Sequence, residues 1–183
     1  MLMSAAIIFS CKSSGHHGGG IHPKFCFTAD TKIAAANGNS VEISKLKVGD
    51  VIMSYNEKTG TSEVATILEM KKAPHNNLVQ LTFENTELKL TNDHPVWVNG
   101  KGWASLNPER TMSYINLTDV KLLAEGDVCF VLNADGKTVQ TKLIKATKLN
   151  DTFETYTITK ISNNKRFFAN GIVVGVEELT EMQ

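Results

Sequence analysis

Cys26 is the residue whose position in this chain best suits a chemical role. It stands at the start of Cys26-Phe27-Thr28-Ala29-Asp30-Thr31, where a glycine-rich stretch gives way to the apolar pattern of an ordered domain. A thiol in this place can attack the carbonyl carbon of the preceding residue, Phe25, and convert the Phe25–Cys26 amide into a thioester. The substrate of this chemistry would be the chain itself.

A second group that could do chemistry lies in the stretch Leu88-Lys89-Leu90-Thr91-Asn92-Asp93-His94-Pro95. The pattern is that of a strand ending in a polar turn, with Pro95 stiffening the return into the next strand. Breaking an amide requires a proton at the leaving nitrogen, and histidine is the side chain able to supply one near neutral pH. Thr91 could hold the backbone or donate to the same site. Taken alone, His94 is better explained as a satisfied turn histidine; paired with Cys26 it becomes a candidate catalytic residue.

The cysteines and the composition exclude several other classes of protein. Cys11, Cys26 and Cys129 are too few and too scattered for a disulfide scaffold or a paired-cysteine zinc site. Cys129 lies in the apolar run Val128-Cys129-Phe130-Val131, which favours a buried core thiol. The formal net charge is +0, so there is no basic surplus for nucleic acid. We therefore expect no nucleic-acid partner.

The residues before Cys26 suggest where the protein is located. Ile8-Phe9-Ser10-Cys11 resembles the cleavage box of bacterial lipoproteins, which predicts lipidation at Cys11 and a membrane-anchored protein of the periplasm or cell surface. The positive residues that normally precede the apolar run are missing. The alternative is a ragged N-terminus on a cytoplasmic protein. A metal cluster of Cys11, His16, His17, His22 and Cys26 would need geometry that a glycine-rich linker does not supply.

The rest of the chain must position Cys26 and His94, and its pattern is β throughout. Short apolar or alternating runs are separated by turn sequences such as Asn37-Gly38, Gly49-Asp50 and Asn99-Gly100. The predicted strands lie at residues 41–43, 51–55, 64–68, 78–83, 88–91 and 96–98. Helical periodicity is nearly absent. This pattern predicts a compact all-β domain that closes on itself to hide its strand edges.

An internal repeat refines this prediction. One set of residues recurs at an offset of 77 residues: Leu46, Gly49, Asp50, Val51 and Asn56 return as Leu123, Gly126, Asp127, Val128 and Asn133. The correspondence continues through Val79 with Tyr156 and, after a one-residue slip, Val96 with Ile172. We infer two copies of one β unit related by a pseudo-two-fold axis.

These motifs together resemble the Hint superfamily, which comprises inteins, bacterial intein-like domains and the autoprocessing domain of Hedgehog proteins. They follow the order seen in that family from Cys26 to about Val176: Cys26 with Asp30-Thr31, Leu46 to Asp50, Thr91-x-x-His94, and Phe167 to Val174. The resemblance implies the horseshoe-like, pseudo-two-fold all-β Hint fold. It also implies an autoprocessing domain over residues 26–177, between an N-terminal signal-like segment and linker at 1–25 and a short tail at 178–183.

The resemblance assigns roles residue by residue. Cys26 would be the nucleophile of an N-to-S acyl shift across the scissile Phe25–Cys26 bond. His94 would protonate or distort this amide. Thr91 and nearby backbone N–H groups would hold the tetrahedral oxyanion. No cofactor is implied, neither ATP nor a metal. The acyl acceptor would be a small nucleophile such as water, a thiol or an amine.

The chain departs from the family in two places. Splicing inteins end in His-Asn, and the asparagine cyclises to free the downstream segment; here Gly175-Val176-Glu177 follows Val174. We therefore expect neither C-terminal cleavage nor splicing. Thr157 also stands where many members carry an aspartate that helps activate the incoming nucleophile. Two alternatives stay open: an inert Hint-fold binding or structural module, and a cysteine hydrolase that acts in trans through Cys26 and His94.

Overall fold

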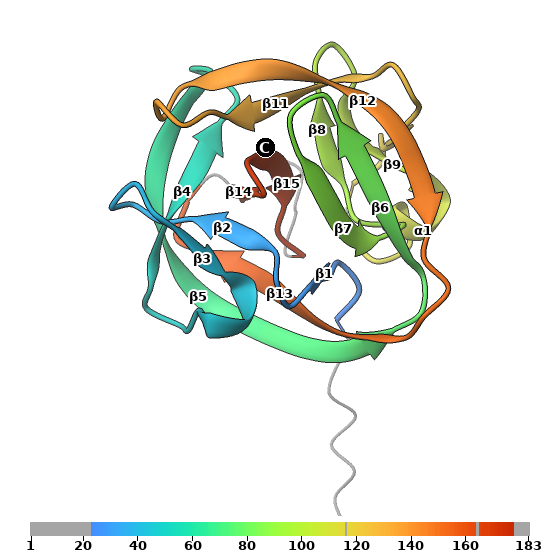
Figure 1. The fold of residues 1–183 in the computed structure, drawn as a ribbon, viewed down its shortest axis with the longest axis horizontal. Coiled ribbons are helices and arrows are strands. Elements are labelled where there is room, and N and C mark those ends of the chain that lie inside the picture. Colours follow the sequence, from blue (N-terminus) through green and yellow to red (C-terminus); the bar gives the residue numbers. More distant parts are fainter. Residues whose placement is uncertain (1–22, 116, 164, 178–183) are drawn as a thin grey trace, which may run out of the picture.

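The computed structural model describes residues 23–115, 117–163 and 165–177 and places them in an all-β domain (Figure 1). Its elements are β1 (Phe27–Thr28), β2 (Lys32–Ala34), β3 (Ser40–Glu42), the 3-10 helix η1 (Ile43–Lys45), β4 (Val51–Asn56), β5 (Thr61–His75), β6 (Leu78–Phe83), β7 (Glu87–Thr91), β8 (Val96–Val98), β9 (Gly102–Ser105), α1 (Pro108–Met112), β10 (Lys121–Leu122), β11 (Val128–Leu132), β12 (Thr138–Lys148), β13 (Phe153–Ile161), β14 (Arg166–Ala169) and β15 (Ile172–Gly175). The all-β class expected from the sequence is confirmed.

Long strands that change partners hold the domain together. β5 pairs with β4 along its first part and with β13 along its second, and β12 pairs first with β11 and then with β6. In Figure 1 these strands curve around the rim, while the β14–β15 hairpin lies towards the centre. Neighbouring strands are hydrogen-bonded from β10 through to β3. The described strands therefore close around one core, as the strand pattern predicts.

The repeat read from the sequence appears as two matching turns. Gly49 and Gly126 have φ angles of +95° and +93°, in the region that glycine adopts without strain. Their N–H groups donate to the carbonyls of Ile67 and Leu143 at 2.9 and 2.8 Å. The following aspartates, at positions 50 and 127, each accept a hydrogen bond at Oδ2 from the backbone N–H three residues earlier. The two halves thus start their first long strand from the same local structure.

The core is built from apolar side chains of both repeats and contains Cys129. Ile52 and Cys129 occupy matching positions of β4 and β11, and both are fully buried. Burial raises the pKa of the Cys129 thiol to about 12, so it stays protonated at neutral pH. The prediction of a core thiol is confirmed.

Element lengths differ from the sequence-based expectation in two ways. The stretch expected as a strand at 64–68 belongs to β5, which runs from Thr61 to His75 and carries its change of partner within the strand. Helix α1 was not expected. It is only five residues long, and its start is set by Pro108 and by the Asn107 side chain, which accepts from the N–H of Arg110.

The packing at the start of the domain includes residues before Cys26. Phe25 is fully buried, and its ring lies 5.5 Å from the imidazole of His94 between ring centroids. The boundary drawn at residue 26 remains a prediction, but Phe25 packs with the core rather than as part of a tail. The predictions of lipidation at Cys11 and of a metal cluster with His16, His17 and His22 concern residues outside the described part of the chain. Within the described part of the chain, no helix has the length and apolar character needed to cross a membrane.

Candidate active site

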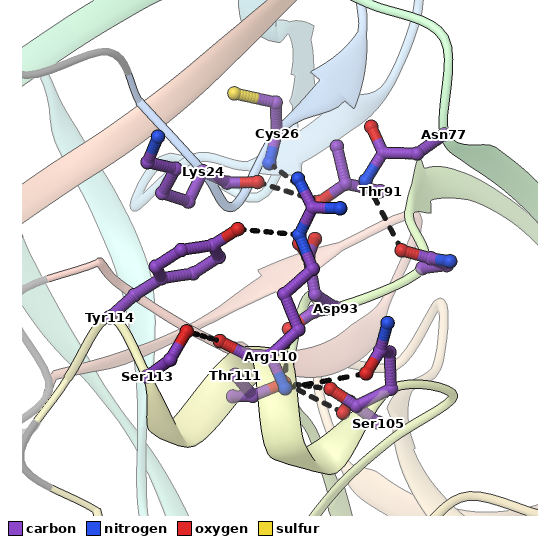
Figure 2. Close-up of polar contacts among 12 residues, drawn as sticks. Lys24, Cys26, Asn77, Thr91, Asp93, Ser105, Arg110, Thr111, Ser113 and Tyr114 are labelled. Atoms are coloured by element: carbon purple, nitrogen blue, oxygen red, sulfur yellow. Dashed lines mark hydrogen bonds and ion pairs between the residues drawn. The ribbon is translucent and has the colours of Figure 1, made fainter.

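Thr91 holds the backbone on both sides of Phe25. Its hydroxyl donates to the Lys24 carbonyl at 2.9 Å and accepts from the N–H of Cys26 at 3.3 Å. Its own N–H donates to the Cys26 carbonyl at 2.9 Å. Figure 2 shows the hydroxyl between the two backbone groups, with the Cys26 sulfur pointing away from Thr91. Thr91 therefore fixes the conformation of the Phe25–Cys26 peptide and contacts the nitrogen that would leave.

Two roles were expected for Thr91, and these contacts correspond to the first, which is to hold the backbone. The second, implied by the family resemblance, places its hydroxyl on the oxyanion, which would form at the Phe25 carbonyl. In the structure the hydroxyl contacts the groups that flank this carbonyl, at Lys24 and Cys26. A hydrogen bond at the leaving nitrogen restrains the amide, but it does not by itself stabilise charge on the oxygen.

The Cys26 thiol lies in an apolar environment, and its residue is fully buried. Burial raises its pKa to about 12, although a hydrogen bond with the Thr155 side chain lowers it; the charges of Glu177 and Asp93 raise it further. Because a thiolate, not a thiol, is the nucleophile, this environment keeps Cys26 in its unreactive form near neutral pH. Attack on Phe25 would therefore require a group that removes the thiol proton.

His94 lies between two aromatic rings beside the scissile peptide. The imidazole centroid is 4.3 Å from the ring of Phe27 and 5.5 Å from that of Phe25. Nε2 is 3.0 Å from the carbonyl oxygen of Gly175 and, because a carbonyl only accepts, Nε2 carries the proton. Burial lowers the pKa of His94 to about 3, partly offset by this hydrogen bond. The resting histidine is thus neutral, with Nδ1 buried and without a hydrogen-bond partner among the described residues.

The end of the domain packs against the same site. Gly175, the last residue of β15, offers its carbonyl to His94. Val176 is buried, and the Glu177 carboxylate accepts from the N–H of Lys24 at 3.2 Å. Burial raises the pKa of Glu177. Residues 175–177 therefore support the junction at Cys26, and none of the three is an asparagine that could cyclise.

A cleft of about 340 Å³ opens beside the junction and is lined by Lys24, Pro74, His75, Asn76, Asn77, Asp93, Arg110 and Thr152. Asp93 is almost completely buried, and its Oδ2 is 2.9 Å from Nε of the half-exposed Arg110. Burial raises the pKa of this carboxyl group. Its Oδ1 has no hydrogen-bond partner in the described structure. The cleft thus gives solvent a route to the backbone at Lys24.

The structure brings Cys26 and Thr91 into direct contact and places His94 beside the Phe25 ring. Sequence reasoning did not single out Asp93, Glu177, Thr155 or His75. Asp93 lies inside the recognised Thr91–His94 turn and could have been considered. The other three approach the junction from distant strands or from the chain end, and no spacing pattern indicates them. The described residues include no cluster of three or more His, Cys, Asp or Glu side chains arranged to hold a metal.

Solved structures with the same fold are inteins and an intein-like domain. A DnaB intein from Synechocystis sp. PCC 6803 matches with a TM-score of 0.68 at 18% identity, covering 83% of this chain and 98% of that one. The bacterial intein-like domain from Clostridium thermocellum has a TM-score of 0.62 at 23% identity, covering 82% and 97%. The gp41-1 intein has a TM-score of 0.62 at 22% identity, covering 82% and 98%. At these identities the likeness establishes the fold: the domain is of the Hint type, as expected.

A comparison with sequence-family models matches a shorter part of the chain. The family model for the Ataxin-1 and HBP1 module (AXH) matches residues 27–134. This range contains Thr91 and His94 but begins after Cys26 and ends before β12. No curated protein matches the sequence. The chain belongs to the Ataxin-1 and HBP1 module (AXH) family over residues 27–134, and the domain that contains this segment has the Hint-type fold of inteins.

Proposed function

We propose that this domain cleaves its own chain between Phe25 and Cys26 through a thioester. The observation that carries the proposal is the Thr91 hydroxyl, which bridges the Lys24 carbonyl and the Cys26 N–H across the bond to be broken. A surface threonine would make such contacts with water; here the two groups belong to the consecutive peptide groups on either side of Phe25. Restraint of this kind lowers the entropy cost of attack by a neighbouring group.

In the first step the Cys26 sulfur adds to the Phe25 carbonyl carbon. The sulfur loses its proton, the carbon–nitrogen bond breaks, and the Cys26 nitrogen gains a proton and becomes an amine. Nδ1 of His94 is buried beside Phe25 and has no hydrogen-bond partner among the described residues, so the proton that the sulfur loses is taken up there and then passed to this nitrogen. The low pKa of the resting histidine, about 3, makes the bound proton a strongly acidic one.

In the second step a small nucleophile attacks the thioester. Water, a thiol or an amine forms a new bond to the Phe25 carbonyl carbon, and the Cys26 thiolate leaves and is reprotonated. The segment ending at Phe25 is released, and the domain keeps Cys26 as its first residue. The cleft beside Lys24 supports an approach of the acceptor from this side. If Cys11 carries a lipid, the same step detaches the domain from the membrane.

The chain end offers no corresponding reaction. In splicing, the nitrogen of a terminal asparagine side chain attacks its own carbonyl carbon. Val176 has no such nitrogen, and its side chain is buried. The proposed activity is therefore N-terminal autoprocessing alone, without cleavage after Val176.

An inert module is the second candidate, favoured by one observation: the pKa of the Cys26 thiol is about 12, so only about 10⁻⁵ of it would be thiolate at pH 7. Thr157, which stands where many family members carry an activating aspartate, also favours the inert module. A hydrolase acting in trans is less well supported, because Phe25 of the chain itself occupies the position that the acyl group of a foreign substrate would need.

Intact mass spectrometry tests the proposal. Incubation of the purified protein with dithiothreitol or hydroxylamine near neutral pH should yield a fragment that begins at Cys26. Thr91→Val should slow the release by about 10² because it removes the hydroxyl that restrains the peptide at Cys26. Thr141→Val is the matched control, since Thr141 is also buried and its hydroxyl has no hydrogen-bond partner in the described residues. Release that persists in Cys26→Ala would exclude the thioester route. A folded wild-type protein that releases nothing would favour the inert module.

A further inference from the structure

The residues before the scissile bond occupy a site of the domain. Pro23 and Phe25 are buried, and Lys24 between them is partly exposed. Both backbone groups of Lys24 are bound: its N–H donates to Oε1 of Glu177 at 3.2 Å, and its carbonyl accepts from the Thr91 hydroxyl at 2.9 Å. The domain therefore holds this segment by its backbone as well as through the bond to Cys26.

The side chains of the segment meet two ring systems. The Phe25 ring lies 5.5 Å from the imidazole of His94 and 6.2 Å from the ring of Tyr114, measured between centroids. Nζ of Lys24 lies 5.2 Å from the centroid of the same Tyr114 ring. Tilted aromatic pairs and a cation near an aromatic ring are both attractive arrangements. Tyr114 thus contacts two consecutive residues of the segment.

Tyr114 is itself held by residues of the domain. It follows helix α1, and its hydroxyl accepts a hydrogen bond from Nε of Arg110, whose guanidinium lies 5.7 Å from the ring centroid. The same Nε is 2.9 Å from Oδ2 of Asp93. Figure 2 shows the Tyr114 ring below Lys24, with its hydroxyl directed towards Arg110. The position of this ring therefore does not depend on the segment alone.

Breaking the Phe25–Cys26 bond removes none of these contacts. Their partners all belong to the part of the chain that begins at Cys26: Thr91, His94, Tyr114 and Glu177. Cleavage by water leaves a carboxylate at Phe25 and an amine at Cys26, which carry opposite charges at neutral pH. Departure of the segment would expose the fully buried Phe25 ring to water, which is unfavourable. Cleavage and departure are therefore separate steps.

We propose that the cleaved domain is a binding module for chain ends with an aromatic last residue, and that its own segment ending at Phe25 is the first occupant. The aromatic ring lies beside His94 and Tyr114, and the residue before it is bound through its backbone. A chain that continues past the aromatic residue would meet Cys26, so the site takes chain ends only. This inference rests on the proposed function, because only cleavage makes the segment exchangeable.

Gel filtration of the processed full chain tests whether the segment stays bound. After incubation with hydroxylamine, denaturing intact mass measures cleavage, and native mass spectrometry of the eluted domain measures the bound segment. Each cleaved domain should carry one segment. Elution of the cleaved domain without it would overturn the inference and leave the proposed function standing. Absence of cleavage from folded wild-type protein would overturn both.

Exchange with labelled peptides tests what the site recognises. A fluorescent peptide with the sequence of residues 22–25 should replace the segment, and its anisotropy should rise. A peptide with its last two residues exchanged has the same composition and charge, and it should bind about 10–10² times more weakly because its aromatic ring is not at the chain end. Alanine in place of the lysine should cost at most about fivefold. Cys26→Ala, which keeps its segment covalently in place, is the control and should bind neither peptide.

Tyr114→Leu should weaken binding of the first peptide by about 2–10-fold, since it removes the aromatic partner of Phe25. Thermal unfolding of this variant separates a lost fold from a lost contact. Equal binding of the two peptide orders, or binding to Cys26→Ala, would show non-specific adhesion and overturn the inference. Failure of the first peptide to replace the segment at large excess would overturn it as well.

Discussion

The two ends of this domain meet at one site but differ in chemistry. At the N-terminal junction, Cys26 is held by the backbone bridge of Thr91 and lies beside Thr155. At the other end, Gly175 and Glu177 contribute a carbonyl to His94 and a carboxylate to the N–H of Lys24. The C-terminal segment has no reactive side chain at the site, yet it positions the residues of the other end. The C-terminal reaction can therefore be absent while the scaffold for the N-terminal reaction is kept.

The scaffold itself shows no such difference between its halves. The turns at Gly49 and Gly126 have nearly the same φ angle, and each is followed by an aspartate with the same backbone contact. Duplication thus accounts for the shared architecture, and the asymmetry lies in the segments added to it. The predictions below test this separation between a symmetric scaffold and an asymmetric site.

Replacing His94 should have the largest effect on the junction. His94→Ala removes the imidazole packed against Phe25, so thiol-induced release should slow by about 10²–10⁴. Release is followed by intact mass, and folding by circular dichroism. An unchanged rate in a folded variant would mean that His94 serves only to pack against the C-terminal segment.

His94 should also make the stability of the fold depend on pH. Its pKa is about 3 in the folded protein, against about 6.5 for an unperturbed imidazole, so the unfolded chain binds the extra proton first. The free energy of unfolding should therefore fall as the pH drops from about 6.5 towards 3, by at most about 1.4 kcal/mol per unit from this residue. Urea unfolding at several pH values checks this.

The comparison with His94→Gln isolates the contribution of the imidazole from those of the carboxylates. Glu42 also has a lowered pKa through its partners Lys32 and Lys45, and Glu154 through a hydrogen bond from Tyr156 and a smaller effect of Lys72. Their effect on stability should persist in the variant. A pH dependence identical in wild type and His94→Gln would show that the imidazole is protonated without cost in the folded state.

The smallest expected effect concerns the symmetric turns. A Cβ added at Gly49 or Gly126 would meet no atom within 4 Å, so the main obstacle to valine at either position is the positive φ angle. Each substitution should destabilise the fold by about 1–3 kcal/mol, and by similar amounts. Chemical denaturation of both variants measures this. A large loss at one turn and none at the other would show that the two halves are not energetically equivalent.

The sequence predicts the fold more fully than the site, because strand patterns are local and site contacts are not. β6 and β8 occupy the predicted ranges, and the glycine turns identify the repeat. The length of β5 was not predicted, because the sequence pattern of a strand that changes partners resembles that of two shorter strands. Thr91 and His94 share a recognisable motif. His75 and Thr155 are 80 residues apart in the chain and meet only through strand pairing, so no spacing indicates them.

The most direct test of the difference between the two ends uses a single fusion protein that carries one reporter before Met1 and a second reporter after Gln183. Incubated with dithiothreitol or hydroxylamine, it should release the first reporter by scission between Phe25 and Cys26 and retain the second. Cys26→Ala should retain both. Intact mass identifies each product. Release of the second reporter, or release of the first without Cys26, would contradict the account.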